Sequence, residues 1–255
     1  MVDLPKKKVG IVACSGEELP EGTITRLAGL KVLEQLRPHE TVTICLPLFL
    51  AGGEGDRAFA RFYPTIAIDG CEKRCAARGT ERYSGKPAAS IIVDQLMREA
   101  GMDEPGGLRE LDEAGMQGVE LVAERTAALV DELLDKKWSR SEGDFIDETG
   151  KDQVSEESLP ESLANSGPVT ASCACGSGIP VQKISVNGTE MTMIALPLIF
   201  EKFHQAGKPP KSETMDELLE TVKIYNPIPE NLTEALPQAL LREYQEFCNR
   251  KDISS

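Results

Sequence analysis

Short runs of apolar and β-branched residues alternate with helical segments over the first hundred residues of the chain. Residues 8–14 (KVGIVAC) predict a buried strand. Leucine and isoleucine then recur at helical spacing over residues 24–36, with Thr23 as the expected cap and Pro38 as the stop. Further strands are expected at residues 41–46, 65–69 and 90–93. This order of elements predicts an α/β fold.

The second half of the chain has a different pattern. A long amphipathic helix is expected over residues 118–136, where it would cover one face of the sheet. Beyond it, Asn187-Gly188 separates two alternating runs, which predicts a type I′ hairpin. Further helices are expected at residues 197–206, 213–224 and 236–248. The tail therefore predicts a smaller α+β domain that contains a β-hairpin.

An acidic segment separates these two parts. Residues 139–168 contain eight acidic and two basic side chains and few large apolar ones. Such a composition cannot bury enough surface to order itself, so we expect a flexible linker. The expected organisation is an α/β domain at residues 1–138, this linker, and a small α+β domain at residues 169–255.

Charge and composition exclude several classes of partner. The net charge is −14 and aromatic residues make up only 5% of the chain, so binding to nucleic acid or to an anionic lipid surface is disfavoured. The longest apolar stretches are well short of the ~20 residues that span a bilayer, which predicts no contact with a membrane. The N-terminal residues show no secretory signal pattern. We therefore expect a cytoplasmic protein.

Seven cysteines are many for a reducing compartment, and four of them stand at the ends of predicted strands. Cys14 ends the first strand, Cys45 ends the second, and Cys71 follows the third, with Cys75 one helical turn later. The carboxyl ends of parallel strands meet at one edge of a sheet. If the first strand is central, four thiolates could surround one Zn²⁺ there, at bonds of ~2.3 Å. The competing interpretation is that Cys14 and Cys45 are small core residues.

Three strings carry a resemblance to a known family. VACSG at residues 12–16, CLP at 45–47 and IDGCEKRCA at 68–76 resemble the DGC-domain proteins, a bacterial and archaeal family named for its Asp-Gly-Cys motif. The similarity covers about residues 8–100. It implies a Rossmann-like domain with Cys14, Cys45, Cys71 and Cys75 as zinc ligands, an assignment that rests in the family largely on the cysteine pattern. The resemblance implies no catalytic activity.

Two further cysteines form a second thiol group. Cys173 and Cys175 stand in a C-x-C motif within a Gly-rich stretch before the hairpin. Such a pair can chelate a soft ion, form a strained disulfide or contribute ligands to a shared cluster. Cys248 lies on an apolar helix face and is expected in the core.

In the Asp69-Gly70 pair, we expect the glycine to supply an unusual backbone angle at the end of the strand.

The sequence therefore favours a cytoplasmic metal-binding protein that holds zinc and acts in metal handling or as an accessory to a partner enzyme. The alternative is an iron–sulfur or dithiol redox protein that uses the same cysteines, with Cys173 and Cys175 as a second redox pair. A third hypothesis has the C-x-C loop deliver metal, sulfur or electrons to a protein partner. Whether the chain is an enzyme stays open, because no phosphate-binding loop or histidine-based catalytic set is present in the sequence.

Overall fold

A computed structural model of the chain describes residues 7–16, 18–146 and 179–254. Its main sheet has four parallel strands in the order β2-β1-β3-β4. The strands are β1 (Val9–Ala13), β2 (Thr41–Thr43), β3 (Thr65–Asp69) and β4 (Ala89–Ile92). All four lie where the sequence predicts strands, although β2 is three residues shorter because the chain turns at Cys45, whose carbonyl accepts from the Leu48 amide.

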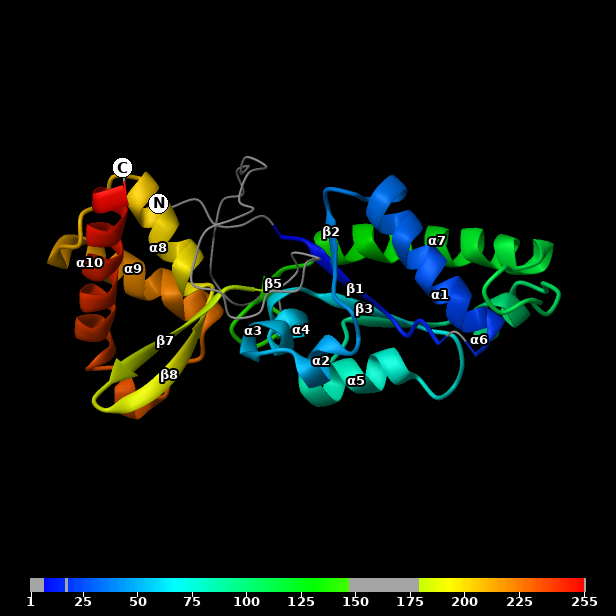
Figure 1. The fold of residues 1–255 in the computed structure, drawn as a ribbon, viewed down its shortest axis with the longest axis horizontal. Helices are drawn as coiled ribbons and strands as arrows, with labels where there is room; N and C mark the ends of the chain where they lie inside the picture. Colours follow the sequence, from blue (N-terminus) through cyan, green and yellow to red (C-terminus); the bar gives the residue numbers. More distant parts are fainter. Residues whose placement is uncertain (1–6, 17, 147–178, 255) are drawn as a thin grey trace.

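Helices cover both faces of this sheet (Figure 1). One layer contains α1 (Pro20–Lys31), the π-helical turn η1 (Val32–Leu36), α6 (Val93–Glu99) and α7 (Glu113–Leu134). The other contains α2 (Leu48–Ala51), α3 (Glu54–Arg57), α4 (Phe59–Phe62) and α5 (Cys75–Tyr83). Side chains alternate between these layers: Ile66 and Ile68 of β3 pack in the first, and Ala67 packs in the second.

The first helix begins earlier than predicted. Leu19 occupies its N-cap position, and Pro20 is the first helical residue. At this position the backbone N–H has no acceptor within the helix, so the missing N–H of proline costs nothing. Thr23, the predicted cap, lies inside the helix instead, and its hydroxyl donates to the carbonyl of Leu108. The helical stretch ends at Leu36, before Pro38 as predicted.

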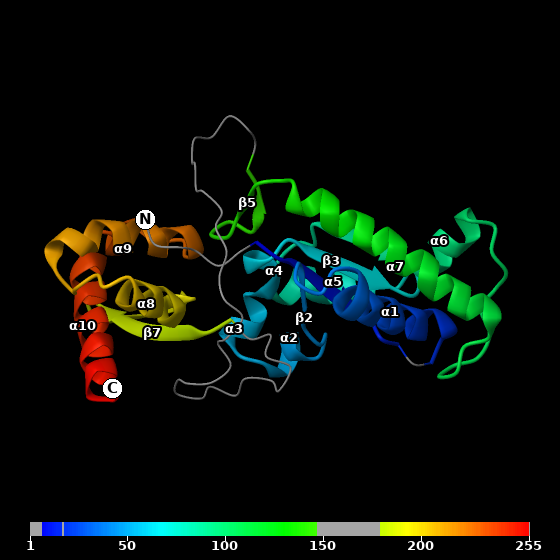
Figure 2. The same cartoon turned by 90° about the horizontal axis from the view of Figure 1, so that it is seen from above.

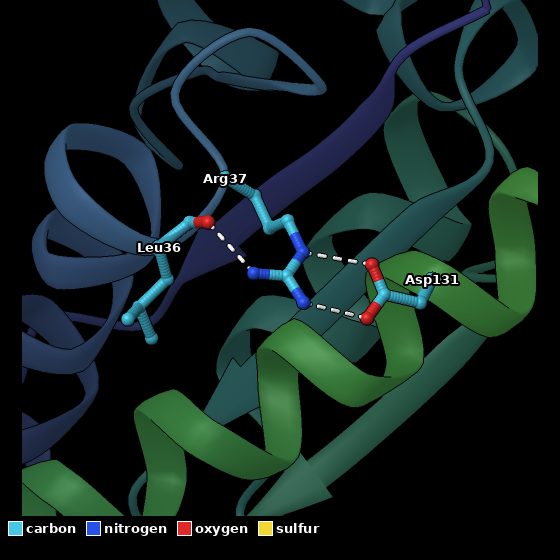
Figure 3. A network of polar contacts seen from close by, with 3 residues as sticks. All are labelled: Leu36, Arg37 and Asp131. Carbon is cyan, nitrogen blue, oxygen red and sulfur yellow. Dashed lines mark hydrogen bonds and ion pairs between the residues drawn. The ribbon is translucent and has the colours of Figure 1, made fainter.

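An ion pair fixes the end of this stretch against the long helix α7. The Nε and Nη2 atoms of Arg37 donate to the two carboxylate oxygens of Asp131 at 2.7 and 2.6 Å, and Nη1 donates to the Leu36 carbonyl (Figure 3). Such a bidentate pair with a carboxylate needs the planar guanidinium of arginine. The bond from Arg37 is the main reason that the pKa of Asp131 lies below its ordinary value.

The C-terminal unit, residues 179–254, is a hairpin packed against helices. Its elements are β7 (Val181–Val186), β8 (Thr189–Ile194), α8 (Leu196–Gln205), α9 (Ser212–Tyr225), the 3₁₀ turn η2 (Glu230–Leu232) and α10 (Leu236–Ser254). Asn187 and Gly188 have φ values of +51° and +79°, which confirms the predicted type I′ turn. This unit lies beyond α3 and α4, at the end of the molecule opposite to α6 (Figures 1 and 2).

The start of the predicted linker is structured. Trp138–Ser139 (β5) and Asp144–Phe145 (β6) pair as a small antiparallel ribbon directly after α7. The remaining residues of that predicted linker, from 147 onward, lie outside the described part of the chain. Across the described ranges, no helix is both long enough and apolar enough to cross a membrane.

Asp112 caps α7 and gives a prediction that depends on pH. Its carboxylate accepts from the amides of Gly115 (2.8 Å) and Gly106 (2.9 Å), and these bonds hold its pKa below the ordinary 3.8. A carboxyl group with a lowered folded pKa stabilises the fold above its unfolded pKa and loses that effect as pH falls through the folded value. Asp112→Ala should therefore lower the melting temperature at pH 7, and the difference from the wild type should narrow toward pH 2.

Thermal denaturation followed by circular dichroism tests this expectation. The matched control is Asp103→Ala, because Asp103 is an exposed aspartate in the loop that leads to the same helix. A difference between wild type and Asp112→Ala that stays constant from pH 7 to pH 2 would contradict the role of the carboxylate charge.

Candidate functional site

The predicted thiol loops meet at the carboxyl edge of the parallel sheet. Strand β1 lies between β2 and β3, so the condition set by the sequence analysis, a central first strand, is confirmed. Cys14 directly follows β1, and Cys45 and Cys71 stand two residues beyond β2 and β3. Neighbouring strands are ~4.8 Å apart, which brings these three loops side by side.

Cys14 is half-buried, and polar groups on two sides orient its sulfur. The amide of Gly70 donates to Cys14 Sγ at 3.4 Å, and Thr25 Oγ1 lies 3.7 Å from the same atom. The Thr25 hydroxyl donates to the Gly22 carbonyl at 2.7 Å and accepts from the Ser15 amide at 3.1 Å. Because a hydroxyl has one proton, the Cys14 thiol is the donor toward Thr25. Cys14 therefore joins the end of β3 to the start of α1.

The other three thiols are more open to solvent. Cys45 is exposed in the turn that leads to α2, and Cys75 is exposed as the first residue of α5. Cys71 is half-buried, and its carbonyl accepts from the Arg74 amide at 3.1 Å, which closes a turn between the two cysteines of this loop. Arg74 has a left-handed backbone with φ of +53°.

Buried Asp69 fixes the end of this loop by hydrogen bonds to the start of α5. It is 1% exposed, and its two carboxylate oxygens accept from the amides of Ala76 and Ala77 at 2.6 and 3.0 Å. These amides belong to the first turn of α5, where the helix itself supplies no acceptors. Burial raises the pKa of Asp69, and the two amide bonds together with the charges of Arg74 and Arg78 oppose that shift. Asp69 thus acts as a long-range cap for the helix that begins at Cys75.

Gly70 has a different role from the predicted one. Its φ does not lie in the positive range, so the expected unusual backbone angle is wrong. The need for glycine is steric: a Cβ atom here would lie 2.9 Å from the Gly22 amide nitrogen and 3.0 Å from the carbonyl carbon of Glu21. The end of β3 therefore packs directly against the first turn of α1. The positive φ values at this edge belong to Ser15 and Arg74.

The three loops share an edge, but their four cysteine side chains do not converge. Within residues 7–16, 18–146 and 179–254, no three side chains of His, Cys, Asp or Glu are close enough to hold a metal ion. The same residues contain no disulfide. By chemistry, the donor set fits a soft or borderline ion, because all four side chains offer sulfur. Coordination of one ion by all four sulfurs would need these side chains to come closer together.

The second predicted thiol group cannot be compared with the structure. Cys173 and Cys175 lie outside the described residues. Cys248 lies on α10 and is buried, as predicted.

Two contributors to this edge were missed by the sequence analysis. Thr25 has no signal that distinguishes it from other helical threonines, because its role depends on a contact with a distant strand end. The role of Asp69 had a weak signal, since a charged residue at the end of an otherwise apolar strand needs a partner when buried.

The part of the chain that contains these loops is similar to a known protein family. Residues 10–115 match the family model of the DGC domain. This range runs from the second residue of β1 past β4 and includes all four strand-end cysteines. No curated protein and no solved structure shows a significant match to the chain.

The capping role of Asp69 gives a stability prediction. Asp69→Ala should lower the free energy of unfolding by about 2 kcal/mol or more, because two buried amides lose their acceptor. Urea denaturation measures this loss, and hydrogen exchange should be faster at Ala76 and Ala77. Glu72→Ala, which changes an exposed acidic residue in the same loop, is the control. An unchanged urea midpoint for Asp69→Ala would show that water replaces the carboxylate without cost.

Proposed function

We propose that this chain, which belongs to the DGC domain family through residues 10–115, binds a thiophilic divalent metal ion at the carboxyl edge of its sheet. Zn²⁺ is the expected ion, and Cys14, Cys45, Cys71 and Cys75 are the proposed ligands. The observation that carries the proposal is the contact between Gly70 N and Cys14 Sγ at 3.4 Å. It brings Cys14 beside the loop that contains Cys71 and Cys75.

The protein groups around the thiols support this role in different ways. Thr25 and Gly70 fix the position of Cys14, while Asp69 fixes the start of α5 and with it the backbone of Cys75. The exposure of Cys45 and Cys75 gives an ion access from solvent. Ligand thiols lose their protons on binding, so metal affinity should rise with pH.

A full set of four protein sulfurs favours metal handling or a structural metal over hydrolysis, because no coordination position is left for an activated water. Two of the thiols face solvent, which also suits exchange of the ion with a partner protein. We therefore propose a role in metal handling or as an accessory to a partner enzyme. The cytoplasm is the proposed location.

Metal analysis of protein purified without oxygen is the first test. We expect one zinc ion per chain, and Cys14→Ser, Cys45→Ser, Cys71→Ser and Cys75→Ser should each lower the bound zinc. Cys248→Ala is the matched control, since this buried cysteine is in α10, far along the chain from the edge. A strand-end variant that keeps full stoichiometry and affinity removes that residue from the ligand set.

The same measurement separates zinc from the iron–sulfur alternative. Colourless protein with zinc and no acid-labile sulfide supports the proposal. Brown protein with iron and sulfide would overturn it in favour of redox chemistry on the same thiols. Protein that binds neither zinc nor iron, even with excess ion added, would leave the cysteines without a metal role.

Removal of the metal gives a second prediction. An ion that binds only the folded chain stabilises it by linkage, so a chelator should lower the melting temperature. Addition of zinc in excess of the chelator should restore it. The metal-depleted Cys14→Ser variant should show no further change with chelator. An identical melting curve before and after verified removal of zinc would contradict a specific site.

A further inference from the structure

Residues 138–146, here called the strap, are fastened to the DGC domain. Trp138 Nε1 donates to the carbonyl of Arg61 in α4 at 3.0 Å, and the Trp138 and Phe145 rings meet edge to face at 5.0 Å. Gly143 in the turn of the strap has φ of +70°, and a Cβ atom there would lie 3.0 Å from Arg61 Cα. The strap therefore lies directly on the backbone of α4.

The same strap reaches the C-terminal unit through Arg140. The Arg140 guanidinium carbon lies 4.8 Å from the centre of the Phe62 ring of α4 and 5.3 Å from that of the Tyr225 ring of α9. Its Nη1 donates to Tyr225 Oη at 3.0 Å. The two rings stack on each other at 5.4 Å with an angle of 19° between their planes. One cation thus contacts both halves of the molecule.

The two rings are shielded from water, and Arg140 is half-buried. Phe62 is 3% exposed and Tyr225 is fully buried. A cation over an aromatic ring contributes more when the pair is removed from solvent than it does at an exposed site. Arg140 therefore has the features of an interface hot spot, a planar cation packed against two stacked aromatic anchors.

A second contact joins the two halves at the level of the backbone. A Cβ atom on Gly55 of α3 would lie 2.2 Å from the carbonyl oxygen of Ile179, so the two backbone segments meet without room for a side chain. Ala58 and Phe62 of the DGC domain also share one hydrophobic core with the C-terminal unit. Among the described residues, the interface is thus apolar at its centre, and Arg140 supplies a hydrogen bond across it.

We infer that the strap joins the DGC domain and the C-terminal unit into a single cooperative folding unit, with Arg140 as the residue that couples them. This differs from the expectation of two domains on a flexible acidic connector, because the first residues of that connector form the joint. The joint lies at the amino edge of the sheet: Phe62 precedes β3, whereas Cys71 follows it. The five residues of β3, ~16 Å in length, separate the joint from the cysteine loops.

The experiment uses the full chain and follows its unfolding in two ways. Trp138 is the single tryptophan of the protein, so its fluorescence reports on the strap, and calorimetry reports on the whole chain. We expect one transition in the wild type, with coincident midpoints by both methods. In Arg140→Ala the transition should split into two, with the fluorescence change in only one of them.

Three further variants separate the contributions. Tyr225→Phe keeps the ring stack but removes the acceptor of the Arg140 bond, and it should lower the midpoint without splitting the transition. Arg140→Lys keeps the charge but loses the planar stack, and it should fall between wild type and Arg140→Ala. Arg82→Ala is the matched control, because Arg82 stacks on Tyr83 at 5.5 Å on the exposed surface of α5 alone. It should unfold as the wild type does.

Two results would overturn the inference. The first is a wild-type chain that already unfolds in two separate transitions, since the halves would then be independent. The second is an Arg140→Ala variant with a single transition at an unchanged midpoint, since the guanidinium would then have no part in the coupling.

Discussion

The fold depends on the pairing of β1 with a parallel neighbour on each side. This central strand bonds to β2 through residues 9–11 and to β3 through residues 10–13. Both faces of the strand are covered by helices, so its apolar side chains are buried whichever way they point. Because the pairing is parallel, the loops after β1, β2 and β3 have to leave the sheet at the same edge. The common location of the thiol loops follows from this arrangement.

Much of the fold could be predicted because its signals are local. The apolar run of β1, the stop at Pro38 and the Asn187-Gly188 turn each act through neighbouring residues. The structure differs from the predictions where contacts between residues distant in the sequence determine the local conformation. Thr23 has the chemistry of a cap, but its hydroxyl reaches Leu108 from inside the helix. The strap has the composition of a linker, yet Phe62 and Tyr225 supply the apolar surface that orders it.

The candidate site also has features that could be predicted from the sequence and features that could not. Residue type and spacing predicted which cysteines stand at the strand ends, and the topology of the sheet agrees. The support beneath them could not be predicted, because it depends on three backbone segments meeting at one place. Gly70 has to be small where β3 meets α1, and Asp69 has to be acidic where β3 meets α5. In the Asp-Gly-Cys motif, two residues thus shape the edge and the third supplies sulfur.

The joint lies at one edge of the sheet and the four strand-end cysteines lie at the other, and this polarity has a practical consequence for handling the protein. Helix α10 ends in the C-terminal unit, at the far end of the molecule from α6 (Figure 1). A protein immobilised through that helix would present its sulfur-bearing loops away from the solid support. In this orientation the loops would stay open to the flowing solution, so the proposed binding of metal could be measured without steric interference from the matrix.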